Sequence, residues 1–288
     1  MINDLGAPYH ILTRYKIVRP VFFIWGFFLL IFFGYTATAQ DNYEIQVYGA
    51  ETVAKGATML ELHSNFTFGG KRQVMDGVLP THNIEHETIE ITHGFNSWFE
   101  TGFYFFNAIG SDNRTNYVGS HIRPRAQIPE SWHWPVGLSL SLEAGYQKPA
   151  YSVDDWTLEI RPIIDKTWGK LYVALNPVFD KSLHGINENK GFSFSPNIKV
   201  SYNLTKFFAG GFEYYGSVGK LTELDPYQQQ QHQLFLVIDL TWLADWEFNA
   251  GYGLGFTSAT DKDILKVIVG YRLHKKPIRP VAAPAKQS

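Results

Sequence analysis

The segment WPVGLSLSLEAGYQ, residues 134–147, alternates strictly between two kinds of side chain. The apolar parity comprises Val136, Leu138, Leu140, Leu142, Ala144 and Tyr146, and the other comprises Gly137, Ser139, Ser141, Glu143, Gly145 and Gln147. Because successive side chains of a strand point to opposite faces, this pattern predicts a strand with one apolar and one polar face. A soluble sheet buries its apolar face, whereas a membrane barrel turns that face outward to lipid.

The same alternation recurs along most of the chain. The further segments are 59–68, 88–92, 99–105, 117–128, 156–165, 171–180, 192–202, 208–214, 233–241, 246–256 and 265–273. Together they predict about twelve strands, most of them longer than the about 5–6 residues typical of globular proteins. Long strands of this kind suit tilted crossings of a membrane.

The connections between these segments alternate in length. The short ones are 94–96, 129–133, 166–170, 203–206 and 243–245, and the generally longer ones are 69–83, 110–116, 148–155, 182–190, 219–230 and 258–263. Six tryptophans lie at or beside the short turns: Trp98, Trp132, Trp134, Trp168, Trp242 and Trp246. Short turns at one end, long loops at the other and an aromatic girdle are typical of outer-membrane barrels.

These patterns predict an all-β fold, a single transmembrane antiparallel β-barrel of about twelve strands in an up-and-down meander. A secreted sandwich or lipid-carrier barrel is the alternative, in which the apolar parity would form a core. The opposite parity is crowded with glycine, serine and charged residues, and the mean hydropathy is −0.16. Both observations favour the membrane barrel, because only half of each strand then meets lipid.

The N-terminus has the pattern of a signal peptide. Basic residues precede the apolar run VFFIWGFFLLIFFGY (residues 21–35), and the small residues Ala37 and Ala39 follow it. We expect a signal peptide over 1–39, cleaved between Ala39 and Gln40; the alternative is a retained membrane anchor. The remaining organisation is a periplasmic N-terminal segment 40–55, the barrel 56–273 and a disordered, basic, proline-rich tail 274–288. An alternative for the tail is binding to the cell wall or a periplasmic partner.

Several segments resemble known proteins. The leader, the even series of strands and the closing KVIVGYRL resemble Gram-negative outer-membrane β-barrel proteins, and Gly270, Tyr271 and Leu273 resemble their C-terminal assembly signal. The segments ELHSNFTF, EITHGF, WFETGFY, HIRPR, ESWHWPVG, EIRPI and NPVFD are similar to transporter-like barrels near the phenol-degradation-associated (MetA-pathway) outer-membrane family. The resemblance covers about residues 44–273, but Leu273 replaces the usual terminal aromatic residue. It implies location in the outer membrane of a Gram-negative bacterium, contact with outer-membrane lipid and lipopolysaccharide, and insertion by the barrel-insertion machinery.

The inward parity of the predicted strands carries many charges. The predicted pore-lining residues are Glu61, His63, Glu100, His121, Arg123, Arg125, Glu143, Glu159, Arg161, Asp165, Lys199, Glu213, Asp239 and Glu247. Hairpin register places Glu143 roughly opposite Glu159, with Arg161 one diagonal step from Glu143. Asp239 falls roughly opposite Glu247. We expect carboxylates and guanidinium groups to interleave along one wall, because facing carboxylates repel unless a cation or proton intervenes.

The predicted function is a porin-like outer-membrane channel for passive diffusion of small hydrophilic or aromatic solutes. A non-conducting structural or adhesive barrel is the first alternative, and a lipid-modifying enzyme the second. We expect no enzyme activity, no catalytic residues and no cofactor. His82 and His86 have metal-like spacing but lie at a predicted loop border, so we interpret them as a solvated cluster and expect no metal. A formal charge of −2 and an absence of cysteine provide no sign of nucleic-acid binding or of thiolate chemistry. The oligomeric state stays open.

Overall fold

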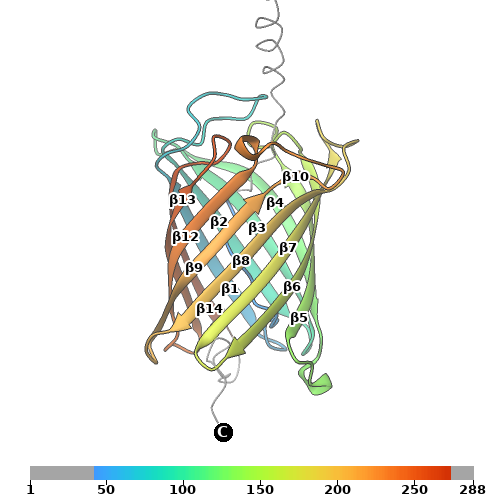
Figure 1. The fold of residues 1–288 in the computed structure, drawn as a ribbon, viewed down its shortest axis with the longest axis vertical. Coiled ribbons are helices and arrows are strands. Elements are labelled where there is room, and N and C mark those ends of the chain that lie inside the picture. Colours follow the sequence, from blue (N-terminus) through green and yellow to red (C-terminus); the bar gives the residue numbers. More distant parts are fainter. Residues whose placement is uncertain (1–41, 274–288) are drawn as a thin grey trace, which may run out of the picture. The chain divides into compact units, whose positions relative to one another are not determined.

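The computed structural model describes residues 42–273, which belong to one compact unit (Figure 1). Twelve long antiparallel strands form a closed barrel. They are β1 (Thr58–Thr67), β2 (Ile84–Gly94), β3 (Phe99–Ile109), β4 (Thr115–Gln127), β5 (Gly137–Gln147), β6 (Trp156–Trp168), β7 (Leu171–His184), β8 (Ser193–Asn203), β9 (Phe208–Ser217), β12 (Gln231–Leu240), β13 (Trp246–Gly255) and β14 (Asp263–Leu273). Each strand pairs with its neighbours along the chain, and β14 pairs with β1 to close the ring.

Only short elements interrupt the connections. The loop between β9 and β12 contains β10 (Gly219–Lys220), β11 (Glu223–Leu224) and the 3₁₀ helix η2 (Tyr227–Gln229). A second 3₁₀ helix, η1 (Glu130–Trp132), lies between β4 and β5. Within residues 42–273, no helix is long and apolar enough to cross a membrane.

The alternation seen in the sequence determines which side of the wall each side chain occupies. In β5, Leu140 and Leu142 are 46% and 40% exposed on the outside, whereas Ser141 is 1% exposed on the inside. The same contrast follows strand after strand, so the apolar rows form the outer surface of the barrel. The predicted all-β barrel of about twelve strands is confirmed, and the polar parity faces the lumen rather than solvent outside.

The two ends of the barrel differ as the connection lengths predict. The long loops gather at one end and the tight turns at the other (Figure 1). The six tryptophans near the tight turns are all exposed. This arrangement provides the outer surface with an aromatic rim at the turn end.

One strand departs from the parity read from the sequence. The alternation in 117–128 places Val118 and Ile122 on the same face. In the structure, Val118 is fully buried inside the barrel, whereas Ile122 is exposed outside. The register of β3 with β4 shifts between Phe106 and Asn107, and such a bulge inserts one residue and reverses the parity beyond it.

The main difference from the expected organisation concerns residues 42–57, here called the N-terminal segment. This segment contains neither helix nor strand and runs inside the barrel, from Asn42 near the long-loop connection at Asp261 to Gly56 near the tight turn at Gly94. Its buried apolar side chains include Ile45 and Val47. The expected periplasmic location of 40–55 therefore does not describe residues 42–55, which occupy the lumen. The predicted signal peptide, its cleavage site and the tail 274–288 lie outside the described residues.

Candidate functional site: the occupied lumen

Side chains of the barrel wall bind the main chain of the N-terminal segment. At the middle of the segment, Tyr48 N donates to Asn176 Oδ1 (2.7 Å), and Asn176 Nδ2 donates to Tyr48 O (3.0 Å). Asn176 lies on β7 with no exposed surface. The side-chain amide of Asn176 thus satisfies both the N–H and the C=O of Tyr48, as a neighbouring strand would.

The same kind of contact is repeated along the segment. Wall groups that bond its backbone are Asn65 at Asn42 O (2.9 Å), Thr88 at Tyr43 O (2.7 Å), Lys266 at Ile45 O (3.1 Å), Asp165 at Ala50 N (3.0 Å) and Gln127 at Thr52 N (2.6 Å). These side chains come from β1, β2, β14, β6 and β4. The segment is therefore held from several sides of the barrel, and these peptide groups are satisfied without a sheet partner.

Aromatic and cationic groups surround Tyr48. The guanidinium carbons of Arg123, Arg161 and Arg125 lie 4.6, 4.9 and 5.6 Å from the Tyr48 ring centroid. The Tyr48 hydroxyl donates to Glu44 Oε1 (2.5 Å), and Glu44 in turn accepts from Arg161 Nη1 (3.3 Å). A desolvated cation–π contact is worth up to about 2 kcal/mol. Tyr48 is thus the main side-chain anchor of the segment.

Apolar patches of the inner wall receive the remaining side chains. Ile45 and Val47 pack against a group formed by Ala174, Tyr215, Phe235, Val237 and Ile264. Tyr43 packs with Tyr104, Phe106, Ala108 and Val118, and Tyr48 and Ala50 pack with Ile163. These wall residues are apolar at inward positions, where a water-filled lumen would favour polar side chains.

Two lysines and two carboxylates form an ionic group that contacts the Ile45 carbonyl through Lys266. Lys199 Nζ lies 2.8 Å from Asp239 Oδ1 and 3.0 Å from Glu213 Oε1. Lys266, which has no exposed surface, forms an ion pair with Glu213 on the other side. Two positive and two negative charges are therefore matched within this group, which limits the cost of burying them.

The structure places all fourteen predicted pore-lining residues on the inward side of their strands, at buried or half-buried positions. Glu143 pairs with Glu159 in the register of β5 and β6, as expected, but it contacts His121 Nδ1 at 2.6 Å. Arg161 instead binds Glu159, with Nε 2.6 Å from Oε1. Asp239 faces Asn249 rather than Glu247. The pore-lining role of these residues stays a prediction.

The histidine interpretation requires a correction. His86 is not part of a solvated loop cluster: it lies in β2, is 3% exposed and packs edge-on against Tyr43 with ring centroids 4.8 Å apart. The residues that bind the N-terminal segment through neutral side chains were also missed, notably Asn176, Gln127 and Thr88. The sequence contains one sign of the N-terminal segment itself. Phe235 and Val237 are apolar at inward positions, which indicates an apolar occupant of the lumen.

The fold is that of the outer-membrane β-barrels. No protein-family model matches the chain, and a comparison with curated proteins finds no match either. Among solved structures, the NanC porin is similar with a TM-score of 0.50, 8% identity and coverage of 75% of this chain and 100% of that one. The KdgM porin has a TM-score of 0.48, 13% identity and coverage of 75% and 99%. An outer membrane channel from Pseudomonas putida has a TM-score of 0.48, 11% identity and coverage of 80% and 100%. At such low identity the likeness concerns the fold alone, and the resemblance to the phenol-degradation-associated family stays a prediction.

Proposed function

We propose that this chain is an outer-membrane channel for small hydrophilic solutes, closed in the described conformation by its own N-terminal segment. The observation that carries the proposal is the way the segment is held. From Asn42 to Val53 its backbone bonds to the wall go to side chains, and only Gly56 and Ala57, next to β1, bond a wall backbone, that of Gly94. Every long strand of the barrel is paired on both sides without the segment. The segment can therefore leave without opening a single strand ladder.

The wall that the segment covers suits a solute path. Inward polar atoms without a hydrogen-bond partner among residues 42–273 include Ser139 Oγ, Ser141 Oγ and Asn197 Oδ1. Buried polar groups cost about 1–3 kcal/mol each when unpaired, so water or a polar solute would satisfy them after the segment moves. The lumen carries both signs of charge, which argues against strong selectivity between cations and anions.

A specific observation also supports the alternative of a non-conducting structural or adhesive barrel. The N-terminal segment is bound along its length by both apolar packing and ionic contacts, so a permanently filled lumen is the direct competitor. Conductance separates the two proposals. The proposal includes no enzyme activity. In this proposal, the apolar outer rows of the barrel contact outer-membrane lipid.

Planar-bilayer recordings of the full chain test the proposal. We compare it with Asn176→Leu, which removes both bonds to the Tyr48 backbone, and with a variant lacking residues 42–52. Asn197→Leu is the matched control, because Asn197 faces Asn176 across the β7–β8 ladder and its Oδ1 has no partner within the described chain. We expect rare openings in the full chain and the control, more frequent openings in Asn176→Leu, and a constantly open pore after the deletion.

A labelling experiment reports on the segment independently of conduction. The chain contains no cysteine, so Val47→Cys introduces a single thiol at a position that is 6% exposed inside the barrel. A water-soluble maleimide should react slowly with this thiol in the full chain and faster when Asn176→Leu is added. If the deletion variant is folded but never conducts, the channel proposal is wrong and the structural barrel takes its place.

A further inference from the structure

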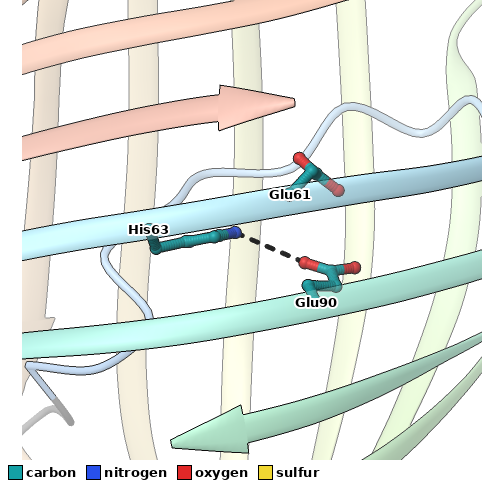
Figure 2. A group of neighbouring side chains, drawn as sticks. All are labelled: Glu61, His63 and Glu90. Atoms are coloured by element: carbon teal, nitrogen blue, oxygen red, sulfur yellow. Dashed lines mark ion pairs between the residues drawn. The ribbon is translucent and has the colours of Figure 1, made fainter. Parts of the chain in front are cut away.

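Glu61, His63 and Glu90 form a compact group on the inner wall, at one side of the lumen (Figure 2). The β1–β2 ladder pairs Glu61 with Glu90, and His63 lies two residues beyond Glu61 on the same face. Each residue provides one donor atom, and these atoms all lie within 4.8 Å of one another. All three side chains are buried, and those of His63 and Glu90 have no exposed surface.

Three polar atoms of this group lack a hydrogen-bond partner among the described residues. Neither ring nitrogen of His63 has a hydrogen-bond partner among the described residues, and the same is true of Glu90 Oε2. His63 Nε2 points to Glu90 Oε2 at 3.5 Å, which is longer than an ordinary hydrogen bond (Figure 2). An unpaired buried imidazole costs about 1–3 kcal/mol. A cation that accepts lone pairs from His63 Nε2 and Glu90 Oε2 would remove this cost.

The charges around the group call for a cation. Glu61 interacts electrostatically with Glu90, Glu247 and Glu100, and with one guanidinium group, that of Arg123. Arg125 contributes a second guanidinium through Glu100, with Nε 2.7 Å from Oε1. Among residues 42–273, Glu61 itself forms no ion pair with a lysine or arginine, because Arg123 and Arg125 pair with Glu90 and Glu100. In the ionic group of Lys199 and Lys266, by contrast, both carboxylates, Glu213 and Asp239, lie directly beside a lysine.

The surroundings also orient Glu90 for binding an ion. Its Oε1 accepts from Thr92 Oγ1 and from Arg123 Nη2, both at 2.6 Å, which leaves Oε2 as the free donor. Hydrogen bonds of this kind to the second oxygen are a regular feature of carboxylates that bind metals. The 3.5 Å between His63 Nε2 and Glu90 Oε2 matches the edge of a tetrahedron whose ligands lie about 2.1 Å from the metal, which is about 3.4 Å.

We propose that Glu61, His63 and Glu90 bind one divalent transition-metal ion of the zinc class. One imidazole and two carboxylates are ligands that this class accepts, and a cation would offset the repulsion between the facing carboxylates of Glu61 and Glu90. The ion would join β1 to β2 inside the lumen. This site is independent of conduction, because it needs neither an open nor a closed lumen.

Zinc binding by the full chain in detergent tests the site. The protein is stripped with a chelator, equilibrated with Zn²⁺ and desalted, and its bound zinc is measured by mass spectrometry. His63→Gln and Glu61→Gln remove ligands, and Thr92→Val removes only a hydrogen bond to Glu90. His121→Gln is the matched control, since His121 is another lumen histidine beside a carboxylate but lies 2.6 Å from Glu143. Heat-modifiable electrophoretic mobility confirms that each variant is a folded barrel.

We expect one tightly bound zinc per chain in the wild type and in His121→Gln. Both ligand variants should lose more affinity than the about 10–100-fold that is typical of removing a supporting hydrogen bond, and Thr92→Val should fall in that range. X-ray absorption at the zinc edge should show an imidazole ligand that is absent in folded His63→Gln. Unchanged tight binding in both ligand variants, or no tight binding in the wild type, would overturn the proposal and leave a shared proton as the partner of these residues.

Discussion

Arg125 and Glu100 form a buried ion pair, with Arg125 Nε 2.7 Å from Glu100 Oε1, and both bind the N-terminal segment. Arg125 Nη1 and Nη2 donate to Gly49 O and Glu51 O at 3.0 Å each. Glu100 Oε2 accepts from Val53 N at 2.5 Å. The pair therefore joins two neighbouring strands, β3 and β4, to residues 49–53 of the segment, shortly before β1 begins.

Removing one partner of this pair should destabilise the protein strongly. We expect Arg125→Met to lower the free energy of unfolding by about 3–5 kcal/mol, because the charge of Glu100 is then left without its closest partner. Arg125→Lys should cost less, and Arg125→Met with Glu100→Gln should recover part of the loss. Urea unfolding in lipid vesicles measures all three, and a loss under about 1 kcal/mol in the Met variant would contradict this role.

The aromatic ring of Tyr48 should matter more than its hydroxyl. Tyr48→Phe removes the bond to Glu44 but keeps the ring among three guanidinium groups, whereas Tyr48→Leu removes those contacts as well. At about 0.5–2 kcal/mol per cation–π contact, we expect Leu to weaken binding of the segment more than Phe. The labelling rate of Val47→Cys measures the difference. Equal rates in the two variants would show that the ring contacts contribute little.

The outer surface of the protein should tolerate a charged substitution only at positions outside the membrane. Leu236 lies on the outward face of β12 and is 64% exposed. We expect Leu236→Arg to cost about 2–4 kcal/mol in lipid vesicles, as for a charge near the bilayer midplane. Leu79→Arg is the control, since Leu79 is exposed in the loop between β1 and β2 and should change stability very little. A similar cost for both substitutions would mean that the outer surface does not face lipid.

Gly94 should resist a larger side chain because the N-terminal segment approaches its backbone. A Cβ at Gly94 would lie 2.1 Å from Val53 O and 2.5 Å from Ala54 O, distances that force the backbone to move. We expect Gly94→Ala to cost about 1–3 kcal/mol, as for overpacking a core. At Gly110, a Cβ would meet side-chain atoms alone, Asp112 Oδ1 at 3.2 Å and Ile84 Cδ1 at 4.0 Å, so Gly110→Ala is the control. Thermal unfolding compares the two.

The alternation of side chains predicts the strands, most of their inward faces and the pairing of Glu143 with Glu159. That success has a physical basis, because lipid and lumen impose opposite requirements on successive residues of a strand. The location of residues 42–57 could not be predicted in the same way. Their surroundings are protein on every side, so neither parity carries a distinct pattern, and their backbone partners are side chains far away in sequence, such as Asn176.

The arrangement of Glu61, His63 and Glu90 could not be predicted from the sequence either. Glu61 and His63 share a strand face, which the sequence shows, but Glu90 joins them only through the register of β1 with β2. The long loop between these strands leaves that register undetermined by turn geometry. The inward position of Val118 has a different cause, because Val118 is itself the extra residue of the bulge between β3 and β4, which the alternation does not reveal.

The path of the N-terminal segment constrains the order in which the molecule can assemble. The segment continues directly into β1, and β1 forms the seam with β14, the last strand of the barrel. The sheet must therefore either curve around the segment before β1 pairs with β14, or close first and let the segment enter the finished barrel as an extended chain. Side chains such as Lys266 and Asn176 would find their backbone partners only at that late moment. The lumen is therefore filled only as the ring closes or after it has closed.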